Sequence, residues 1–159
     1  MERVAVFPGS FDPFTIGHEE IVRRGLKIFD RIIIAIGMNV AKSGFWDVNT
    51  RVALIRKVFR DDPQVSVECY SGLTVDYCRH IKAHFIIRGL RTAADFEYER
   101  AVGQINRTLE NSIETVFLLT SPQHTFISST IVKDILVNGG DASKFLPSHI
   151  TREDLIGEK

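Results

Sequence analysis

The sequence has little cysteine, no excess charge of either sign and no long apolar run. Cys69 and Cys78 are its only cysteines, too few and too poorly spaced for a zinc site or a disulfide framework, so we expect both to be reduced structural residues. The 20 basic and 20 acidic side chains give zero net charge, whereas proteins that bind nucleic acid usually carry a basic excess. No apolar stretch approaches the roughly 20 residues that a membrane span needs. We therefore expect neither a nucleic acid nor a membrane as partner, although a local cationic pocket stays open.

Two common nucleotide-binding fingerprints are also missing. The sequence contains neither G-x-G-x-x-G nor the P-loop pattern G-x-x-x-x-G-K-[ST]. It also lacks the layout of a signal peptide, because a strand-like run begins directly after Met1, and we expect a cytoplasmic protein. The 159 residues fit one domain, and 44% apolar with 25% charged residues is typical of a globular chain.

Strand-like and helix-like segments alternate along the chain. Helical periodicity continues past residue 50 in a segment that we expect Asn49 to cap, and Gly139 is expected to stop the last long helix. Five strand-then-helix units predict a single α/β domain with a Rossmann-like five-stranded parallel sheet and helices on both faces, followed by a short helical tail over about 141–159. The predicted strands are 3–8, 31–37, 64–69, 83–88 and 113–119, and the predicted helices are 17–29, 50–60, 73–81, 93–109 and 130–138.

Such a fold binds ligands at the carboxyl ends of its strands, which makes the following loops the candidate sites. After the first strand, Gly9 and Gly17 allow close backbone approach, Ser10 offers a hydroxyl, and His18 lies at a helix start that attracts anions. The alternative is that Thr15 caps this helix and His18 is an ordinary surface residue.

The next two loops carry weaker signals. Lys42 is a lone cation after the second strand, and a solvated surface lysine is the alternative to an anion contact. Thr74 follows the third strand as either a helix cap or a ligand contact, and spacing does not separate the two.

The last two loops combine groups that suit phosphate. Arg88 and Arg91 flank Gly89 after the fourth strand, and arginine forks fit phosphate oxygens. The alternative is a pair of salt bridges to Asp95, Glu97 or Glu99. After the fifth strand, three consecutive hydroxyl residues at 128–130 begin a helix, which makes a second anion site, or else one cap with two incidental hydroxyls.

These loops resemble known motifs. Thr15-Ile16-Gly17-His18 resembles the T/H-x-G-H signature of the nucleotidyltransferase superfamily, and Ile127-Ser128-Ser129-Thr130 resembles its serine-rich second signature. The stretch from Ile87 to Glu99, reading IRGLRTAADFEYE, is similar to the long signature of the phosphopantetheine adenylyltransferase family. Pro8-Gly9-Ser10-Phe11-Asp12-Pro13 also matches, and the resemblance extends from about residue 3 to about residue 147.

The resemblance implies transfer of the adenylyl group of ATP to 4′-phosphopantetheine, giving dephospho-coenzyme A and pyrophosphate. It further implies Mg²⁺ as cofactor, a homohexamer, and coenzyme A as a candidate feedback ligand. It assigns no protein ligand to the metal. Two departures are Ser10, where many members have threonine, and His124, where some have tryptophan.

By motif position, the resemblance assigns three groups of residues. The catalytic group is His18, Lys42 and Arg91. The acceptor site comprises Ser10, Lys42, Thr74 and Arg88. The ATP site comprises Ser10, Phe11, Gly17, His18, Gly89, Leu90, Arg91, Glu99, His124, Thr125, Phe126, Ile127, Ser128, Ser129 and Thr130.

The expected chemistry needs no general base. A phosphate monoester has its second pKa at about 6 and is already largely a dianion at neutral pH, so the enzyme must align two anions and stabilise the transition state. Alternative functions are another adenylyl- or cytidylyltransferase, for example with a nicotinate mononucleotide acceptor, a non-catalytic nucleotide sensor, and a nucleic-acid-binding domain. The stretch from Arg88 to Glu99 favours the phosphopantetheine acceptor over the first of these.

Overall fold

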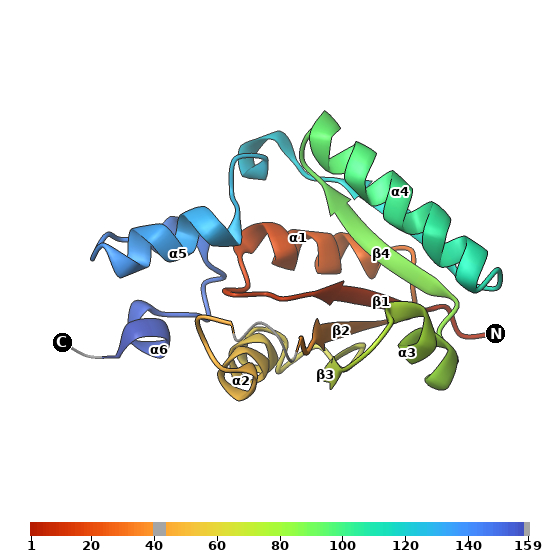
Figure 1. Cartoon of the computed structure of the whole chain (residues 1–159). Coiled ribbons are helices and arrows are strands. Elements are labelled where there is room, and N and C mark those ends of the chain that lie inside the picture. The colour runs from red at the N-terminus through yellow and green to blue at the C-terminus, as the bar shows by residue number, and fades with distance from the viewer. Residues whose placement is uncertain (40–43, 158–159) are drawn as a thin grey trace.

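The computed structural model describes residues 1–39 and 44–157 of the chain (Figure 1). Strands and helices alternate from the N-terminus up to α5, as the sequence predicts. The strands are β1 (Val4–Gly9), β2 (Arg31–Gly37), β3 (Val65–Tyr70), β4 (Phe85–Leu90) and β5 (Glu114–Leu119). The helices are α1 (Ile16–Gly25), α2 (Val48–Val58), α3 (Thr74–His80), α4 (Ala93–Leu109), α5 (Ser129–Val137) and α6 (Arg152–Ile156), with 3-10 turns η1 (Pro122–His124) and η2 (Ser143–Phe145).

The five strands form one parallel sheet in the order β3-β2-β1-β4-β5. The chain leaves β1 toward β2 and β3 on one side and returns through α3 to β4 and β5 on the other. The order therefore reverses between β1 and β4, and this switch point is where such sheets bind ligands.

Alternating side chains of the strands build a core on each face of the sheet. Phe7, Ile34 and Ile87 pack with buried residues of α1, α2 and α5 on one face. Val6 and Ile86 point the other way and pack with residues of α3. Helix α4 lies alongside β4 and β5 on that second face (Figure 1). The predicted sheet with helices on both faces is thus confirmed.

Strands β1 and β4 separate before they end. Their pairing joins Ala5 to Phe85 and Val6 to Ile86, whereas β1 pairs with β2 along its whole length as far as Gly9. The carboxyl halves of the two central strands therefore leave space between them at the switch point.

Several predicted boundaries shift for local reasons. Asp47, and not Asn49, caps α2, because the Asp47 carboxylate accepts a hydrogen bond from the Thr50 amide at 3.0 Å and the helix begins at Val48. Helix α1 ends at Gly25, and the apolar pattern that suggested a longer helix continues into a turn whose Phe29 is still buried. The predicted stop after α5 is confirmed, since Gly139 has φ 78° and the amides of Gly139 and Gly140 bond back to the last turn.

No helix in the described part of the chain is long and apolar enough to cross a membrane.

Candidate functional site

Two cavities meet at the point where β1 and β4 separate. The larger, of about 340 Å³, lies against α1, the start of α4 and the loop before α5, and we call it the donor cavity. The smaller, of about 230 Å³, lies against β2, β3 and α4, and we call it the acceptor cavity. Their shared wall consists of Pro8, Gly9, Ser10, Arg88 and Glu99. A ligand in one cavity would therefore touch the same arginine and serine as a ligand in the other.

His18 is held in one orientation by the start of its own helix. Thr15 is the N-cap of α1, and its backbone amide donates to His18 Nδ1 at 3.0 Å, while the His18 amide donates to Thr15 Oγ1 at 3.4 Å. Because Nδ1 is the acceptor, the ring proton of neutral His18 sits on Nε2. The imidazole packs edge-on against Phe11, with ring centroids 5.0 Å apart, and also contacts Phe14.

The surroundings keep His18 uncharged. Burial, followed by the nearby Arg88 and Arg91 guanidiniums, lowers the pKa of His18 to about 3. At neutral pH the ring is therefore a neutral hydrogen-bond donor through Nε2, and it cannot serve as a cation. The alternative interpretation of this motif is correct for Thr15, which caps the helix. It is wrong for His18, which lines the donor cavity and is not an ordinary surface residue.

Gly9 makes room for this arrangement. A Cβ at Gly9 would lie 2.8 Å from Cζ of Phe11, whose ring is buried under His18. Phe11 itself has a positive φ of 48°, which turns its ring inward. A side chain at position 9 would therefore clash with the Phe11 ring, which explains the glycine there.

Arg88 spans the gap between the central strands. Its Nη1 donates to the Pro8 carbonyl of β1 at 2.5 Å, and its Nε and Nη2 donate to the Glu99 carboxylate at 2.9 and 2.5 Å. Glu99 is buried in the second turn of α4, so the ion pair is largely screened from water.

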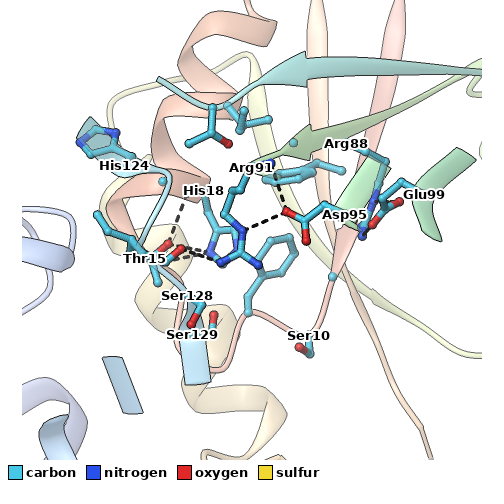
Figure 2. A pocket seen from close by; sticks show the side chains of 18 of the residues that line it. Ser10, Thr15, His18, Arg88, Arg91, Asp95, Glu99, His124, Ser128 and Ser129 are labelled. Carbon is cyan, nitrogen blue, oxygen red and sulfur yellow. Dashed lines mark hydrogen bonds and ion pairs between the residues drawn. The ribbon is translucent and has the colours of Figure 1, made fainter. Parts of the chain in front are cut away.

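Arg91 is anchored in a similar way. Its Nη1 donates to the Ile127 carbonyl at 2.9 Å, and its Nε lies 3.3 Å from Asp95 Oδ2. In Figure 2, His18 and Arg91 occupy the middle of the view, between the Arg88–Glu99 pair and His124. The salt-bridge alternative is thus correct for both arginines, yet both also line the donor cavity.

The start of α5 provides a second helix N-terminus in the donor cavity. Ser128 is the N-cap, accepting from the Ile131 amide at 3.2 Å, and Ser129 Oγ donates to the Pro13 carbonyl at 2.8 Å. Thr130 also lines the cavity. Only one hydroxyl caps the helix, as in the alternative, but all three residues line the cavity at a helix N-terminus, which attracts anions.

His124 is fixed by a residue that sequence reasoning did not single out. Glu20 of α1 accepts from His124 Nδ1 at 2.5 Å, from Arg24 Nη1 at 3.1 Å and from the Ser121 hydroxyl. Burial opposes ionisation of Glu20, but these hydrogen bonds outweigh it and lower its pKa. Glu20 therefore ties the turn after β5 to α1.

The acceptor cavity is bounded by aromatic and polar side chains. The Thr74 hydroxyl hydrogen-bonds the Tyr70 hydroxyl at 2.8 Å, and Leu73, not Thr74, occupies the cap position of α3. Tyr98, Val102 and Asn106 of α4 line the opposite wall. Their spacing of four residues puts them on one helix face, a periodic signal that could have identified them from the sequence.

Most predicted site residues gather at these cavities, with four exceptions. Lys42 lies outside the described residues. Leu90 is buried and lines neither cavity, the Thr125 hydroxyl bonds the Pro122 carbonyl, and the exposed Phe126 lies against Phe145. Of the residues predicted for the ATP site, those that line the donor cavity are Ser10, Phe11, Gly17, His18, Gly89, Arg91, Glu99, His124, Ile127, Ser128, Ser129 and Thr130. Of those predicted for the acceptor site, Ser10, Thr74 and Arg88 line the acceptor cavity.

Buried hydrogen bonds of Asp12 and Arg51 hold the loop that forms part of the shared wall. The buried Asp12 carboxylate accepts from the Phe45 and Trp46 amides at 2.8 and 3.0 Å, and buried Arg51 donates to the Ser10 carbonyl at 2.7 Å and to the Trp46 carbonyl at 2.9 Å. Except for the bond between Arg51 and Trp46, these contacts join segments more than 30 residues apart in the sequence, so no local pattern indicated them.

Comparison with known proteins identifies the family of the chain. The cytidylyltransferase-like family model matches residues 6–135. Phosphopantetheine adenylyltransferase of Flavobacterium johnsoniae is 51% identical over 93% of this chain and 97% of its own, and that of Bacteroides fragilis is 48% identical over 91% and 96%.

Solved structures share the fold at lower identity. A putative nicotinate-nucleotide adenylyltransferase from Vibrio parahaemolyticus superposes with a TM-score of 0.69 at 21% identity, over 94% of this chain and 96% of its own. A bifunctional NMN adenylyltransferase/ADP ribose pyrophosphatase from Francisella tularensis gives 0.71 at 17% identity, over 94% and 46%. The close sequence relatives, together with the paired cavities, show that the chain belongs to the phosphopantetheine adenylyltransferase family of nucleotidyltransferases.

Proposed function

We propose that the protein transfers the adenylyl group of ATP to 4′-phosphopantetheine, giving dephospho-coenzyme A and pyrophosphate. The observation that carries the proposal is the pair of cavities with a common wall at Ser10 and Arg88. A nucleotide in the donor cavity and a phosphate ester in the acceptor cavity would bring their phosphates together at this wall.

The reaction is an in-line displacement. An oxygen of the acceptor phosphate attacks the α-phosphorus of ATP, the new P–O bond forms, and the bond to the bridging oxygen of pyrophosphate breaks. Because the acceptor is already largely dianionic at neutral pH, no group has to remove a proton from it. A neutral His18 suits this chemistry, since Nε2–H donates to the α-phosphate oxygens as charge builds on them.

The remaining residues hold the two substrates. Arg88 and Arg91 bind phosphate oxygens, and the amides at the starts of α1 and α5 receive the triphosphate. Thr74 and Ser10 contact the acceptor. Lys42 completes the acceptor site in this proposal, because in the sequence it belongs to the segment between β2 and α2.

Magnesium enters this scheme as part of the nucleotide substrate. The described residues contain no group of three or more histidine, cysteine or acidic side chains that could hold a metal ion, and the carboxylates of Asp95 and Glu99 are engaged by arginines. Mg²⁺ commonly keeps several waters and binds through substrate phosphates. We propose that it arrives as MgATP and neutralises triphosphate charge.

We also propose a cytoplasmic homohexamer, with coenzyme A as a feedback ligand. Exposed apolar side chains support self-association: Tyr98, Ile105 and Leu109 on α4 are 70%, 60% and 55% exposed, and Leu119 at the end of β5 is 71% exposed. Phe45, in the loop before α2, is also exposed. Trp46 is not available for self-association, because it is buried and its Nε1 donates to the Leu155 carbonyl at 2.6 Å.

The direct test is pyrophosphate release from ATP and Mg²⁺ with 4′-phosphopantetheine, with nicotinate mononucleotide and with no acceptor. We expect release with phosphopantetheine alone. Release with nicotinate mononucleotide instead would replace the acceptor and keep the cavities. Binding of ATP without release in any reaction would favour the non-catalytic sensor.

A further inference from the structure

The two arginines of the site are each held at two points by partners of the same kind. Arg88 is bound by the Glu99 carboxylate and the Pro8 carbonyl, and Arg91 by the Asp95 carboxylate and the Ile127 carbonyl. Each carboxylate comes from the first two turns of α4 and each carbonyl from a different loop or strand. Neither side chain can rotate without losing both kinds of contact.

The contacts of Arg88 leave a defined part of its guanidinium free. A guanidinium carries five N–H donors. Three of them are used, through Nε and Nη2 to Glu99 and through Nη1 to Pro8. One donor remains on each terminal nitrogen and is available to a phosphate oxygen. Arg88 lines both cavities, so a ligand in either cavity can reach its guanidinium.

The carboxylates of Asp95 and Glu99 do not help the site to attract anions. Asp95 and Glu99 are four residues apart and share one face of α4. Their two negative charges cancel those of Arg88 and Arg91, while His18 is neutral, so this part of the site has no net charge. Removing either carboxylate would strengthen the long-range attraction for phosphates. Their contribution must therefore be sought in geometry.

We propose that Asp95 and Glu99 are positioning residues for adenylyl transfer. They fix the orientation of Arg91 and Arg88 so that the unused N–H donors face the reacting phosphates, and they do so although they lower the positive charge of the site. The inference rests on the proposed function. It also changes the role that family resemblance implied for Glu99, because both of its carboxylate oxygens are bound by Arg88 and it acts on ATP through that arginine.

The chain offers a matched control on the same helix. Glu97 lies between the two acids but pairs with Arg100 at 3.0 Å, and its side chain is 67% exposed. Glu97→Gln changes the net charge by the same amount as Glu99→Gln without touching Arg88 or Arg91. The pair of variants therefore separates a general charge effect from an effect on arginine geometry.

Turnover measurements distinguish the effect on arginine geometry from the general charge effect. We expect Glu99→Gln to lower kcat roughly tenfold without lowering the KM for 4′-phosphopantetheine, since its amide N–H₂ would face the guanidinium and turn it. Asp95→Asn should act in the same direction, and Glu97→Gln should leave kcat within about twofold of the wild type. A lower KM with unchanged kcat in Glu99→Gln would show that the acid merely weakens anion binding, and would overturn the proposal.

A double variant tests whether Glu99 acts through Arg88. If it does, Glu99→Gln adds no further loss of kcat in an Arg88→Ala background, because coupled residues are not additive. An equal loss in both backgrounds would make Glu99 an independent ligand and would refute the positioning role.

A third readout does not need turnover. A guanidinium held by a carboxylate rotates slowly about its Nε–Cζ bond, so we expect separate side-chain NMR signals for Arg88, assigned by their absence in Arg88→Lys. These signals should merge in Glu99→Gln and persist in Glu97→Gln. Persistence in Glu99→Gln would contradict the proposal. Wild-type protein with this signature but no pyrophosphate release would instead count against the proposed function.

Discussion

The two anion-binding parts of the site are built in different ways. His18 is oriented by Thr15, three residues before it, and by the rings of Phe11 and Phe14 in the same loop. Arg88 is oriented by Pro8, 80 residues away, and by Glu99 on the next helix. A histidine side chain can thus be oriented within one helix cap, whereas an arginine that bridges two strands needs the complete sheet.

The largest expected effect comes from removing the locally specified donor. His18→Ala should reduce kcat on the order of a hundredfold or more with little change in ATP affinity, because Nε2–H is used mainly in the transition state. Pyrophosphate release and calorimetric ATP binding measure the two quantities. His80→Ala, at an exposed position of α3, is the control. Near-normal turnover of His18→Ala would remove His18 from the mechanism.

The pH dependence of stability provides the next largest effect. The pKa of His18 is about 3 in the folded chain and about 6.5 in a model peptide, so between these values the unfolded chain binds a proton that the folded chain does not. The stability associated with neutral His18 is therefore fully present above pH 6.5 and is lost as the pH falls toward 3.

Urea unfolding of the wild type and His18→Gln at pH 7 and pH 5 measures this loss. We expect the free energy of unfolding of the wild type to fall by about 2 kcal/mol more than that of the variant, at about 1.4 kcal/mol per pH unit below 6.5. Equal losses would mean that His18 takes up its proton in the folded protein, and that burial and the neighbouring Arg88 and Arg91 do not hold it neutral.

The arginine side of the comparison should respond to geometry at constant charge. Arg91→Lys keeps the charge, but a lysine cannot bond Asp95 and the Ile127 carbonyl and still present a fork. We expect kcat to fall about tenfold, a change of about 1.4 kcal/mol. Arg100→Lys, which affects only exposed contacts with Glu97 and Gln104, should be close to the wild type. Full activity of Arg91→Lys would mean that charge suffices there.

The smallest expected effect concerns the cap itself. Thr15→Val removes the hydroxyl that caps α1 but keeps the backbone amide that bonds His18 Nδ1. We expect a loss of about 1 kcal/mol in the free energy of unfolding and turnover within about threefold of the wild type. Thr108→Val, whose hydroxyl bonds a carbonyl within α4, serves as the stability control. A large loss of turnover would show that the hydroxyl, and not the amide, orients His18.

The sequence by itself determined the order of strands and helices, the parallel sheet and most of the loops that carry the site. Those features depend on periodicity and on residues near one another in the chain, which also explains why the motif around His18 could be identified. Its error at Asn49 was local in origin too, because Asp47 forms the cap of α2. For Thr74 the sequence left a cap and a ligand contact open, and the structure excludes the cap, since Leu73 occupies that position.

Only the tertiary structure decided which groups are free to act. It paired Arg88 with Glu99 and His124 with Glu20, clamped the loops through Asp12 and Arg51, and placed Leu90 and Phe126 away from the donor cavity. Most of these contacts join segments that are tens of residues apart, and whether a given arginine meets a carboxylate or a phosphate depends on the distance and burial that packing sets. The sequence names the groups that can bind phosphate, and the packed sheet determines how many of their hydrogen-bond donors remain available.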